Sequence, residues 1–355
     1  MARSSQADKG HLLVVRLSAM GDVAIAVPVL EALRRSYPDL RITVLTRRFF
    51  KPFFREIERI EFFSPDFDCR HKGLAGLLRL AGDLKRLDID MVADLHDVLR
   101  TKVLRMMFRA FGWSVATIDK GSKEKKSLVR SHLKVVRPLK PTIERYRETI
   151  EALGLTGFVP ELPVEKRLQP IPKGMLAAAK VRVKAQRAKW IGVAPFAQHR
   201  GKVYPLPLMA ELIAILAMQY ERLFIFGGGP YEREFAEYME GQHKNVASVI
   251  GRIKLAEELD LISNLDCMVT MDSSAMHMAS LMSVPVVSIW GATHPFAGFY
   301  GYGQELRNAV QSELPCRPCS VYGNQPCIFG DYRCMHAIAP STIADMVAKV
   351  TGRRR

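Results

Sequence analysis

Residues 267–291 of this chain read CMVTMDSSAMHMASLMSVPVVSIWG, and this stretch decides the fold. It divides into an apolar run, a polar turn, a short helical segment and a second apolar run, at residues 267–271, 272–277, 278–282 and 284–291. Continuous apolar runs are typical of strands in a parallel sheet covered on both faces. A turn that opens a helix offers unpaired N–H groups and the positive end of the helix dipole to an anion. The stretch therefore predicts a phosphate or diphosphate site, and an N-cap role alone for Asp272 or Ser273 is the alternative.

The same alternation of strands and helices runs along the rest of the chain. Further buried strands are predicted at residues 11–17, 41–46, 90–95, 190–195 and 223–226. Helices are predicted after the first strand, with Ile25, Val29 and Leu33 on one face, and at residues 74–87, 99–111, 208–218, 232–239 and 255–263. This order is typical of α/β domains with a doubly wound parallel sheet.

Proline and glycine residues interrupt the alternation between Pro160 and Gly174, which is a linker composition. We therefore expect two Rossmann-like domains that face a cleft, because ligands of such sheets bind at the carboxyl ends of the strands. The predicted parts are an N-terminal domain, a linker, a C-terminal domain and a C-terminal helix, at residues 1–160, 161–175, 176–335 and 336–355.

The composition, with 48% hydrophobic and 25% charged residues, is that of a globular protein. No run approaches the roughly 18 apolar residues that a membrane-spanning helix needs. The polar residues 1–10 do not resemble a secretory signal. We therefore expect a cytoplasmic protein.

Positive charge is concentrated in one stretch. The formal net charge is +16, and ten Lys or Arg residues lie between Lys120 and Arg147, against Glu124 and Glu144. Such a cluster attracts nucleic acid or acidic lipid, or it forms a solvated face without a partner. Tyr146 is its single aromatic residue, which argues against stacking on single-stranded nucleic acid.

Three turns of the second domain are predicted at the carboxyl ends of strands, where one nucleotide could touch all of them: residues 196–202, 227–232 and 272–277. Lys202 would neutralise a phosphate and Glu232 would accept hydrogen bonds from ribose hydroxyls. The triple glycine before Glu232 lets the backbone approach a ligand closely. Taken singly, Lys202 is equally well a surface lysine and the glycines a plain turn.

Asp22 occupies the corresponding first turn of the first domain, at the start of a helix. A carboxylate in this position either stabilises the helix N-terminus or serves as a general base. Both interpretations place it at the carboxyl edge of the first sheet.

These features resemble glycosyltransferase family nine, the lipopolysaccharide heptosyltransferases of GT-B fold, over nearly the whole chain. The resemblance rests on RLSAMGD at 16–22 with AVPVL at 26–30, DLH at 94–96, GGGPYE at 227–232, and DSSAMH at 272–277 with Pro285 and Gly291. It implies an inverting glycosyltransferase that moves a sugar, heptose from ADP-heptose, onto a lipopolysaccharide core acceptor. It also implies no required cofactor and no metal, since a lysine and a helix end stabilise the leaving diphosphate.

The resemblance also assigns roles to residues. Asp22 is the implied catalytic base. The implied donor-binding residues are Lys202, Glu232, Ile253, Asp272, Ser273, Ser274 and His277. His277 is equally well a structural histidine. Arg47, Arg48 and Arg100 follow strands of the first domain and are expected on the acceptor side.

Two departures leave the donor open. Ser274 stands where family members that use ADP-heptose commonly have glycine, and residues 196–201 read FAQHRG where they often have paired threonines. The expected acceptor is an anionic glycolipid of the lipid A-core type, which fits the basic stretch. The expected location is therefore peripheral, at the inner face of the cytoplasmic membrane, with no nucleic acid as partner.

Four of the six cysteines crowd near the C-terminus, at Cys316, Cys319, Cys327 and Cys334. The first pair has zinc-knuckle spacing and the second pair does not, so a structural zinc is a weak candidate beside buried thiols. Disulfides are not expected in a reducing cytosol.

Two other functions remain open from the sequence. A sugar-nucleotide epimerase of GT-B-like fold shares the nucleotide site but lacks a reason for Asp22 in the first turn. A basic nucleic-acid-binding protein would use residues 120–147 and would leave the three nucleotide-site turns unexplained.

Overall fold

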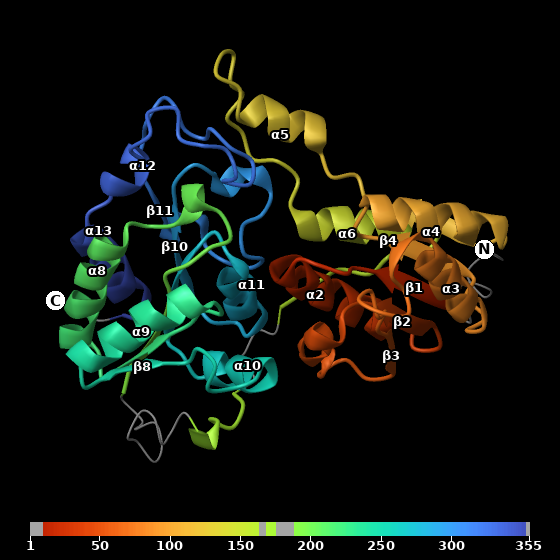
Figure 1. Cartoon of the computed structure of the whole chain (residues 1–355), viewed down its shortest axis with the longest axis horizontal. Coiled ribbons are helices and arrows are strands. Elements are labelled where there is room, and N and C mark those ends of the chain that lie inside the picture. The colour runs from red at the N-terminus through yellow and green to blue at the C-terminus, as the bar shows by residue number, and fades with distance from the viewer. Residues whose placement is uncertain (1–9, 163–167, 175–187, 353–355) are drawn as a thin grey trace. The chain divides into compact units, whose positions relative to one another are not determined.

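The computed structural model describes residues 10–162, 168–174 and 188–352, which form two compact units (Figure 1). The first unit comprises the chain up to Lys120 together with Thr142–Glu161. The second comprises Gly121–Pro141 and the chain from Leu162 onward. Parts of the predicted linker, residues 163–167 and 175, lie outside the described residues.

The first unit is built on a five-stranded parallel sheet of order β3-β2-β1-β4-β5. Its strands are β1 (His11–Val15), β2 (Arg41–Leu45), β3 (Ile60–Phe63), β4 (Met91–Asp94) and β5 (Ser114–Thr117). Its helices are α2 (Met20–Ser36), η1 (Arg48–Phe54), α3 (Gly73–Lys85), α4 (Leu99–Ala110) and α6 (Thr142–Glu151).

Strand β1 is buried along its whole length, as its continuous apolar run predicts. Leu13 and Val15 pack with side chains of α3 and α4. Successive strand side chains alternate between faces, so Leu12 and Val14 point to the other side of the sheet. Because all five strands are parallel, their carboxyl ends meet at one edge, where the loops after β1, β4 and β5 come together.

The second unit holds a six-stranded parallel sheet of order β11-β10-β9-β6-β7-β8. Its strands are β6 (Trp190–Ala194), β7 (Arg222–Ile225), β8 (Val246–Ser248), β9 (Cys267–Met271), β10 (Val286–Trp290) and β11 (Ala309–Gln311). Its helices are α5 (Ser122–Leu128), η2 (Arg200–Lys202), α8 (Leu206–Gln219), α9 (Pro230–Gln242), α10 (Leu255–Ser263), α11 (Ser274–Leu281), η3 (Pro295–Ala297), η4 (Leu306–Asn308), α12 (Arg333–His336) and α13 (Pro340–Val350).

All the predicted strands form within two residues of the expected bounds. Helix α11 begins four residues before the predicted start, so Ser274–His277 are helical and not part of the turn. The physical reason is that Ser273, with an extended backbone, already ends the turn as the N-cap. Residues Gly121–Pro141 belong to the second unit, although the sequence places them in the first domain.

Helix α8 has an unusually apolar sequence. The run Arg200–Gln219 includes both η2 and α8. It has the length and composition of a membrane-spanning helix, and it is the one such case in the described chain. The expectation that no run is long enough is therefore wrong by that criterion. Its apolar character is accounted for by packing, because Leu212 and Leu216 are fully buried in a core with Ile343 and Val347 of α13.

Candidate functional site

In the first unit, Asp22 lies in the first turn of α2, as the sequence predicts. Its carboxylate forms an ion pair with Arg16, which follows β1. It also accepts a hydrogen bond from the backbone N–H of Ala19, at 3.3 Å. Arg16 Nη1 donates in turn to the carbonyl oxygen of Leu95, at 2.5 Å. The carboxylate is thus held at the carboxyl edge of the sheet from both β1 and β4.

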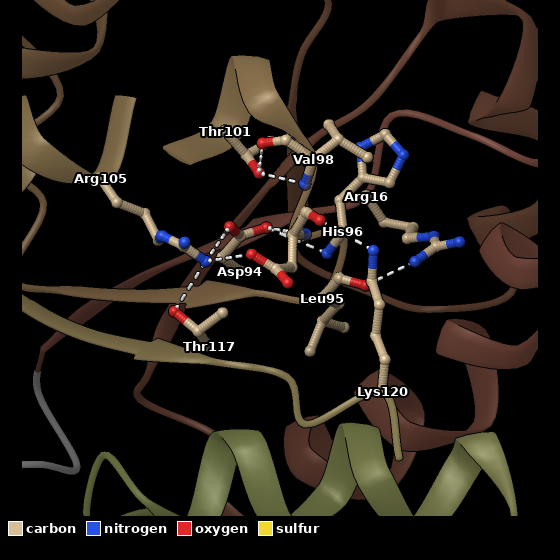
Figure 2. A network of polar contacts seen from close by, with 10 residues as sticks. Arg16, Asp94, Leu95, His96, Val98, Thr101, Arg105, Thr117 and Lys120 are labelled. Carbon is tan, nitrogen blue, oxygen red and sulfur yellow. Dashed lines mark hydrogen bonds and ion pairs between the residues drawn. The ribbon is translucent and has the colours of Figure 1, made fainter. Parts of the chain in front are cut away.

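The loop after β4 is fixed by the buried Asp94 (Figure 2). Its Oδ1 accepts from the backbone N–H groups of His96 and Asp97, both at 3.0 Å. Its Oδ2 pairs with Arg105 Nη1 at 2.9 Å, and the same nitrogen donates to Thr117 of β5 at 3.0 Å. This network ties the ends of β4 and β5 together and orients the turn that presents His96.

Three cations surround His96. Burial, and after it the charges of Arg16, Lys120 and Arg100, together lower its pKa to about 4, although Asp22 opposes them. Nε2 of His96 lies 3.3 Å from Ser18 Oγ, and Nδ1 is buried with no hydrogen-bond partner among the described residues. The imidazole is therefore neutral at physiological pH.

Two further residues reach the same edge. Lys120 Nζ donates to the carbonyl oxygen of Asp97 at 2.7 Å, and burial lowers its pKa (Figure 2). Tyr146 of α6 is fully buried and donates from its hydroxyl to the carbonyl oxygen of Asp22 at 3.3 Å. The Arg16 guanidinium lies over its ring, 5.8 Å from the centroid. We predicted no role for these groups from the sequence, although His96 directly follows the predicted strand at residues 90–95 and Arg16 directly follows the observed β1.

The three arginines expected on the acceptor side have different surroundings. Arg47 and Arg48 follow β2 and are exposed. Arg100 lies in the first turn of α4, with its guanidinium 3.8 Å from the centroid of the Phe67 ring, and contributes to the low pKa of His96. Of the three, Arg100 is the one that the described interactions link to the edge that holds Asp22.

In the second unit, an ion pair connects the segment that follows β6 with the turn that follows β9. Lys202 Nζ lies 2.8 Å from Asp272 Oδ2, and the two side chains are only 14% and 5% exposed. Because the charges compensate each other, Lys202 can stay largely buried at the carboxyl edge of the sheet. Asp272 therefore positions Lys202 and does not itself offer an attractive contact to an anion.

Helix α11 supplies the predicted helix N-terminus next to this pair. Ser273 is the N-cap and makes no capping hydrogen bond from its side chain. Its hydroxyl instead lies 3.0 Å from Thr270 Oγ1. Ser274 is the first helical residue, and His277, half-buried, lies in the same first turn. The N–H groups at the start of a helix lack acceptors within the helix itself, and together with the nearby Lys202 they make an arrangement that suits a diphosphate.

Glu232 has a structural partner in its own turn. Its Oε2 accepts from the backbone N–H of Gly228 at 2.6 Å and of Gly229 at 3.3 Å, which caps the start of α9. A ribose contact would therefore use its other oxygen or displace these bonds. Ile253 lies half-buried in the loop between β8 and α10, at the carboxyl edge of the sheet.

The cysteine-rich loop packs against the lysine of the site. Gly201 donates from its N–H to the carbonyl oxygen of Gly323 at 3.3 Å. Gly323 has a φ of +74°, in the left-handed region, and a Cβ there would stand 2.6 Å from Lys202 Cγ. This glycine therefore lets the loop lie directly on the Lys202 side chain.

The cysteines themselves are free thiols. Burial raises the pKa of both Cys319 and Cys334. Within residues 10–162, 168–174 and 188–352, no three His, Cys, Asp or Glu side chains are grouped as a metal site. The zinc candidate at Cys316, Cys319, Cys327 and Cys334 thus gains no geometric support.

Two parallel α/β sheets, each with polar groups at its carboxyl edge, define the GT-B class of fold. The structure is similar to that of a family 9 glycosyltransferase from Veillonella parvula DSM 2008, with a TM-score of 0.73, 19% identity and 98% of each chain covered. It is also similar to the structure of Escherichia coli ADP-heptose lipopolysaccharide heptosyltransferase II, with a TM-score of 0.68 and 16% identity, over 97% of this chain and 99% of that one.

The sequence identifies the family. The model of glycosyltransferase family 9 (heptosyltransferase) matches residues 77–327, so the chain belongs to this family of enzymes. Among curated proteins it is 25% identical over 310 residues to the lipopolysaccharide core heptosyltransferase OpsX of Haemophilus influenzae, over 85% of this chain and 82% of that one.

A more distantly related structure is relevant to the prediction that no metal is required. The dodecameric iron-containing glycosyltransferase TibC from enterotoxigenic E. coli H10407 has a TM-score of 0.56 and 14% identity, over 97% of this chain and 76% of that one. At this identity the similarity concerns the fold. Independence from metal therefore stays a prediction for this chain.

Proposed function

We propose that this enzyme transfers heptose, with inversion at the anomeric carbon, from ADP-heptose to a hydroxyl of a lipopolysaccharide core acceptor. The observation that carries the proposal is Asp22, a carboxylate held by Arg16 at the carboxyl edge of the first unit's sheet. The names of the relatives, a lipopolysaccharide core heptosyltransferase and an ADP-heptose lipopolysaccharide heptosyltransferase, support the choice of donor and acceptor.

In this reaction Asp22 accepts the proton of the acceptor hydroxyl, while the oxygen of that hydroxyl attacks the anomeric carbon of heptose. The bond between that carbon and the diphosphate oxygen breaks on the opposite face, so the configuration inverts and ADP leaves. Lys202 and the N–H groups of α11 stabilise the negative charge that develops on the diphosphate. These groups take the part that a metal ion plays in other transferases.

The remaining donor contacts belong to the same proposal. Ser273 and Ser274 lie against the diphosphate, Glu232 meets the ribose, and Ile253 lies near the base. The half-buried His277 supports the first turn of α11. The acceptor, an anionic glycolipid, is bound by the first unit with Arg100, Arg47 and Arg48, and the enzyme works at the inner face of the cytoplasmic membrane.

Thermal-shift binding tests the donor. ADP and ADP-heptose are expected to raise the melting temperature more than the UDP, GDP and CMP counterparts, because a ligand that binds only the folded state stabilises it. Stabilisation by another nucleotide would overturn the assignment of ADP-heptose and keep the reaction class. No shift with any of them would overturn the donor site.

Product analysis tests the base. Asp22→Asn should lower kcat by about 10²–10⁴-fold and leave ADP binding unchanged. Glu31→Gln, a carboxylate near the other end of the same helix, is the matched control and should keep full activity. Equal activity of the Asp22→Asn variant and the control would rule out Asp22 as the base.

A further inference from the structure

The basic loop, residues 129–140, connects α5 to α6 but is anchored on the second unit (Figure 1). The backbone N–H of Leu139 donates to the carbonyl oxygen of Phe296 at 2.9 Å, and Leu139 packs with Leu128 and Ala297. Lys134 Nζ donates to the carbonyl oxygen of Cys316 at 3.0 Å. The loop is therefore fixed to the second unit in its middle, at Lys134, and near its end, at Leu139.

The middle of the loop exposes apolar side chains. Leu133 is 89% exposed, and Val135 and Val136 are about half exposed, at 47% and 50%. One exposed leucine is ordinary, but three aliphatic side chains within four residues form a local patch. About half or more of each of these side chains is open to solvent, so the patch can contact another surface.

The backbone at Leu133 strengthens this point. Its φ is +52°, a left-handed conformation that favours glycine or asparagine and is unfavourable for leucine. A tight turn at this position would be more stable with either of those residues. Instead, Leu133 has the most exposed large hydrophobic side chain among the described residues, which indicates that the side chain serves a contact.

Basic side chains flank the patch. Arg130 and Arg137 are exposed on either side of it, and Lys123 and Lys126 are exposed on α5. No Asp or Glu occurs between Glu124 and Glu144. By contrast, Lys120, Arg145 and Arg147 of the same sequence stretch bind partners inside the first unit and take no part in this surface.

We propose that the basic loop docks the enzyme on an anionic phospholipid bilayer, with Leu133, Val135 and Val136 entering the headgroup region. Aliphatic side chains beside arginines match the apolar boundary and the negative charge of such a surface. Nucleic acid fits less well, because the loop has no Phe, Tyr or Trp on which a base could stack. The inference rests on the proposed function only in identifying this bilayer with the inner face of the cytoplasmic membrane.

Vesicle flotation of the full chain tests the docking. The protein should bind phosphatidylcholine vesicles that contain phosphatidylglycerol, and bind pure phosphatidylcholine much more weakly. Leu133→Asn combined with Val136→Asn should lower the partition coefficient at least about tenfold, because two apolar side chains no longer leave water. Asparagine suits the backbone at position 133, so this variant is expected to fold.

Removal of basic side chains tests the electrostatic part of the docking proposal. Arg130→Gln combined with Arg137→Gln should lower binding to the anionic vesicles about 25-fold, at about fivefold for each arginine, and added salt should also weaken binding by the unaltered enzyme. Met218→Asn and Lys244→Gln remove an exposed apolar and an exposed basic side chain elsewhere on the second unit and should leave binding unchanged.

A Leu133→Trp variant reports insertion directly. After subtraction of the unaltered protein's emission, its fluorescence should shift to the blue on anionic vesicles. Equal vesicle binding by the loop variants and the controls, no blue shift, or tighter binding to RNA than to vesicles would each overturn the docking proposal. The ADP-induced thermal shift of every variant is measured in parallel, so loss of donor binding is distinguished from loss of membrane binding.

Discussion

The guanidinium group of Arg16 binds the carboxylate of Asp22 and, through Nη1, the carbonyl oxygen of Leu95. One side chain thus fixes the first turn of α2 relative to the loop that follows β4. Arg16 is 7% exposed, so this contact is largely shielded from the screening that weakens surface ion pairs. A base that must meet an acceptor hydroxyl gains from being held in this way.

Replacement of Arg16 should therefore affect the chemical step. We expect Arg16→Met to lower kcat about 100-fold, because Asp22 loses the group that orients it, with little change in KM for the donor. Arg16→Lys keeps the charge but not the planar fork, so it should recover part of the lost rate. Steady-state kinetics at saturating donor measure both effects.

A purely structural role for Arg16 would give a different pattern. Both variants would then melt at lower temperature while the folded fraction kept its normal kcat. An Arg16→Met enzyme within about twofold of the unaltered kcat would exclude a positioning role.

The ion pair of Lys202 and Asp272 predicts coupled effects on stability. Asp272→Asn leaves the lysine charge without its partner, which should cost about 3 kcal/mol in the free energy of unfolding. Lys202→Met should cost a similar amount and also weaken ADP binding. Urea denaturation of both variants and of the double variant checks this, and the loss in the double variant should be about 1–3 kcal/mol smaller than the sum. Additive losses would mean that the pair contributes no coupling.

The sequence predicted the central strands well and the edge strands not at all. Strands β1, β6 and β9 are continuous apolar runs because both faces of a central parallel strand are covered. Strands β3 and β8 stand at sheet edges, with three or four residues each, and leave no comparable pattern. The same holds for the other two edge strands, β5 and β11.

The candidate site was predictable in its positions more than in its contacts. The positions of Asp22, Lys202 and Glu232 at the carboxyl edges of the two sheets could be predicted, because residues after parallel strands gather at one edge. The pairing of Lys202 with Asp272 could not, because it joins loops separated by many residues. The anchoring of the basic loop on Phe296 was hidden for the same reason.

Glu232 allows a test that separates its cap from a ribose contact. Glu232→Ala removes the acceptor for the N–H groups of Gly228 and Gly229 and should destabilise the protein by about 1 kcal/mol. Glu232→Gln keeps an acceptor and should cost less than half of that. If Glu232 binds ribose, both variants should lose ADP affinity, as measured by calorimetry. Full affinity in the Glu232→Ala variant would limit this residue to capping α9.

His96 predicts a pH dependence of stability. Its pKa is lowered from 6.5 to about 4, chiefly by burial, so between these values the unfolded chain binds a proton that the folded protein does not. Stability should therefore fall as the pH drops from 6.5 toward 4, by at most about 3 kcal/mol from this residue, and be unaffected above 6.5. Denaturation of the unaltered protein and of His96→Gln at pH 7 and pH 5 should show a smaller loss in the variant. His132→Gln, at an exposed position, is the control and should lose as much as the unaltered protein.

Gly298 predicts how firmly the basic loop is anchored. Its φ is +82°, and a Cβ there would stand 2.6 Å from the carbonyl oxygen of Lys140. Gly112 has a nearly equal φ of +84°, and a Cβ there would meet no atom within 4 Å. Both alanine variants bear the backbone cost of about 1 kcal/mol, but only Gly298→Ala must also push the loop away.

We therefore expect Gly298→Ala to lose about 1–2 kcal/mol more than Gly112→Ala in the free energy of unfolding. Limited trypsin digestion should cut the Gly298→Ala variant faster after Arg130 and Lys134, because the loop is no longer held against Phe296. Since docking on a bilayer needs Leu133 presented by an anchored loop, the same variant should bind anionic vesicles more weakly. Equal digestion rates for the two alanine variants would show that the contact of Lys140 with Gly298 does not hold the loop.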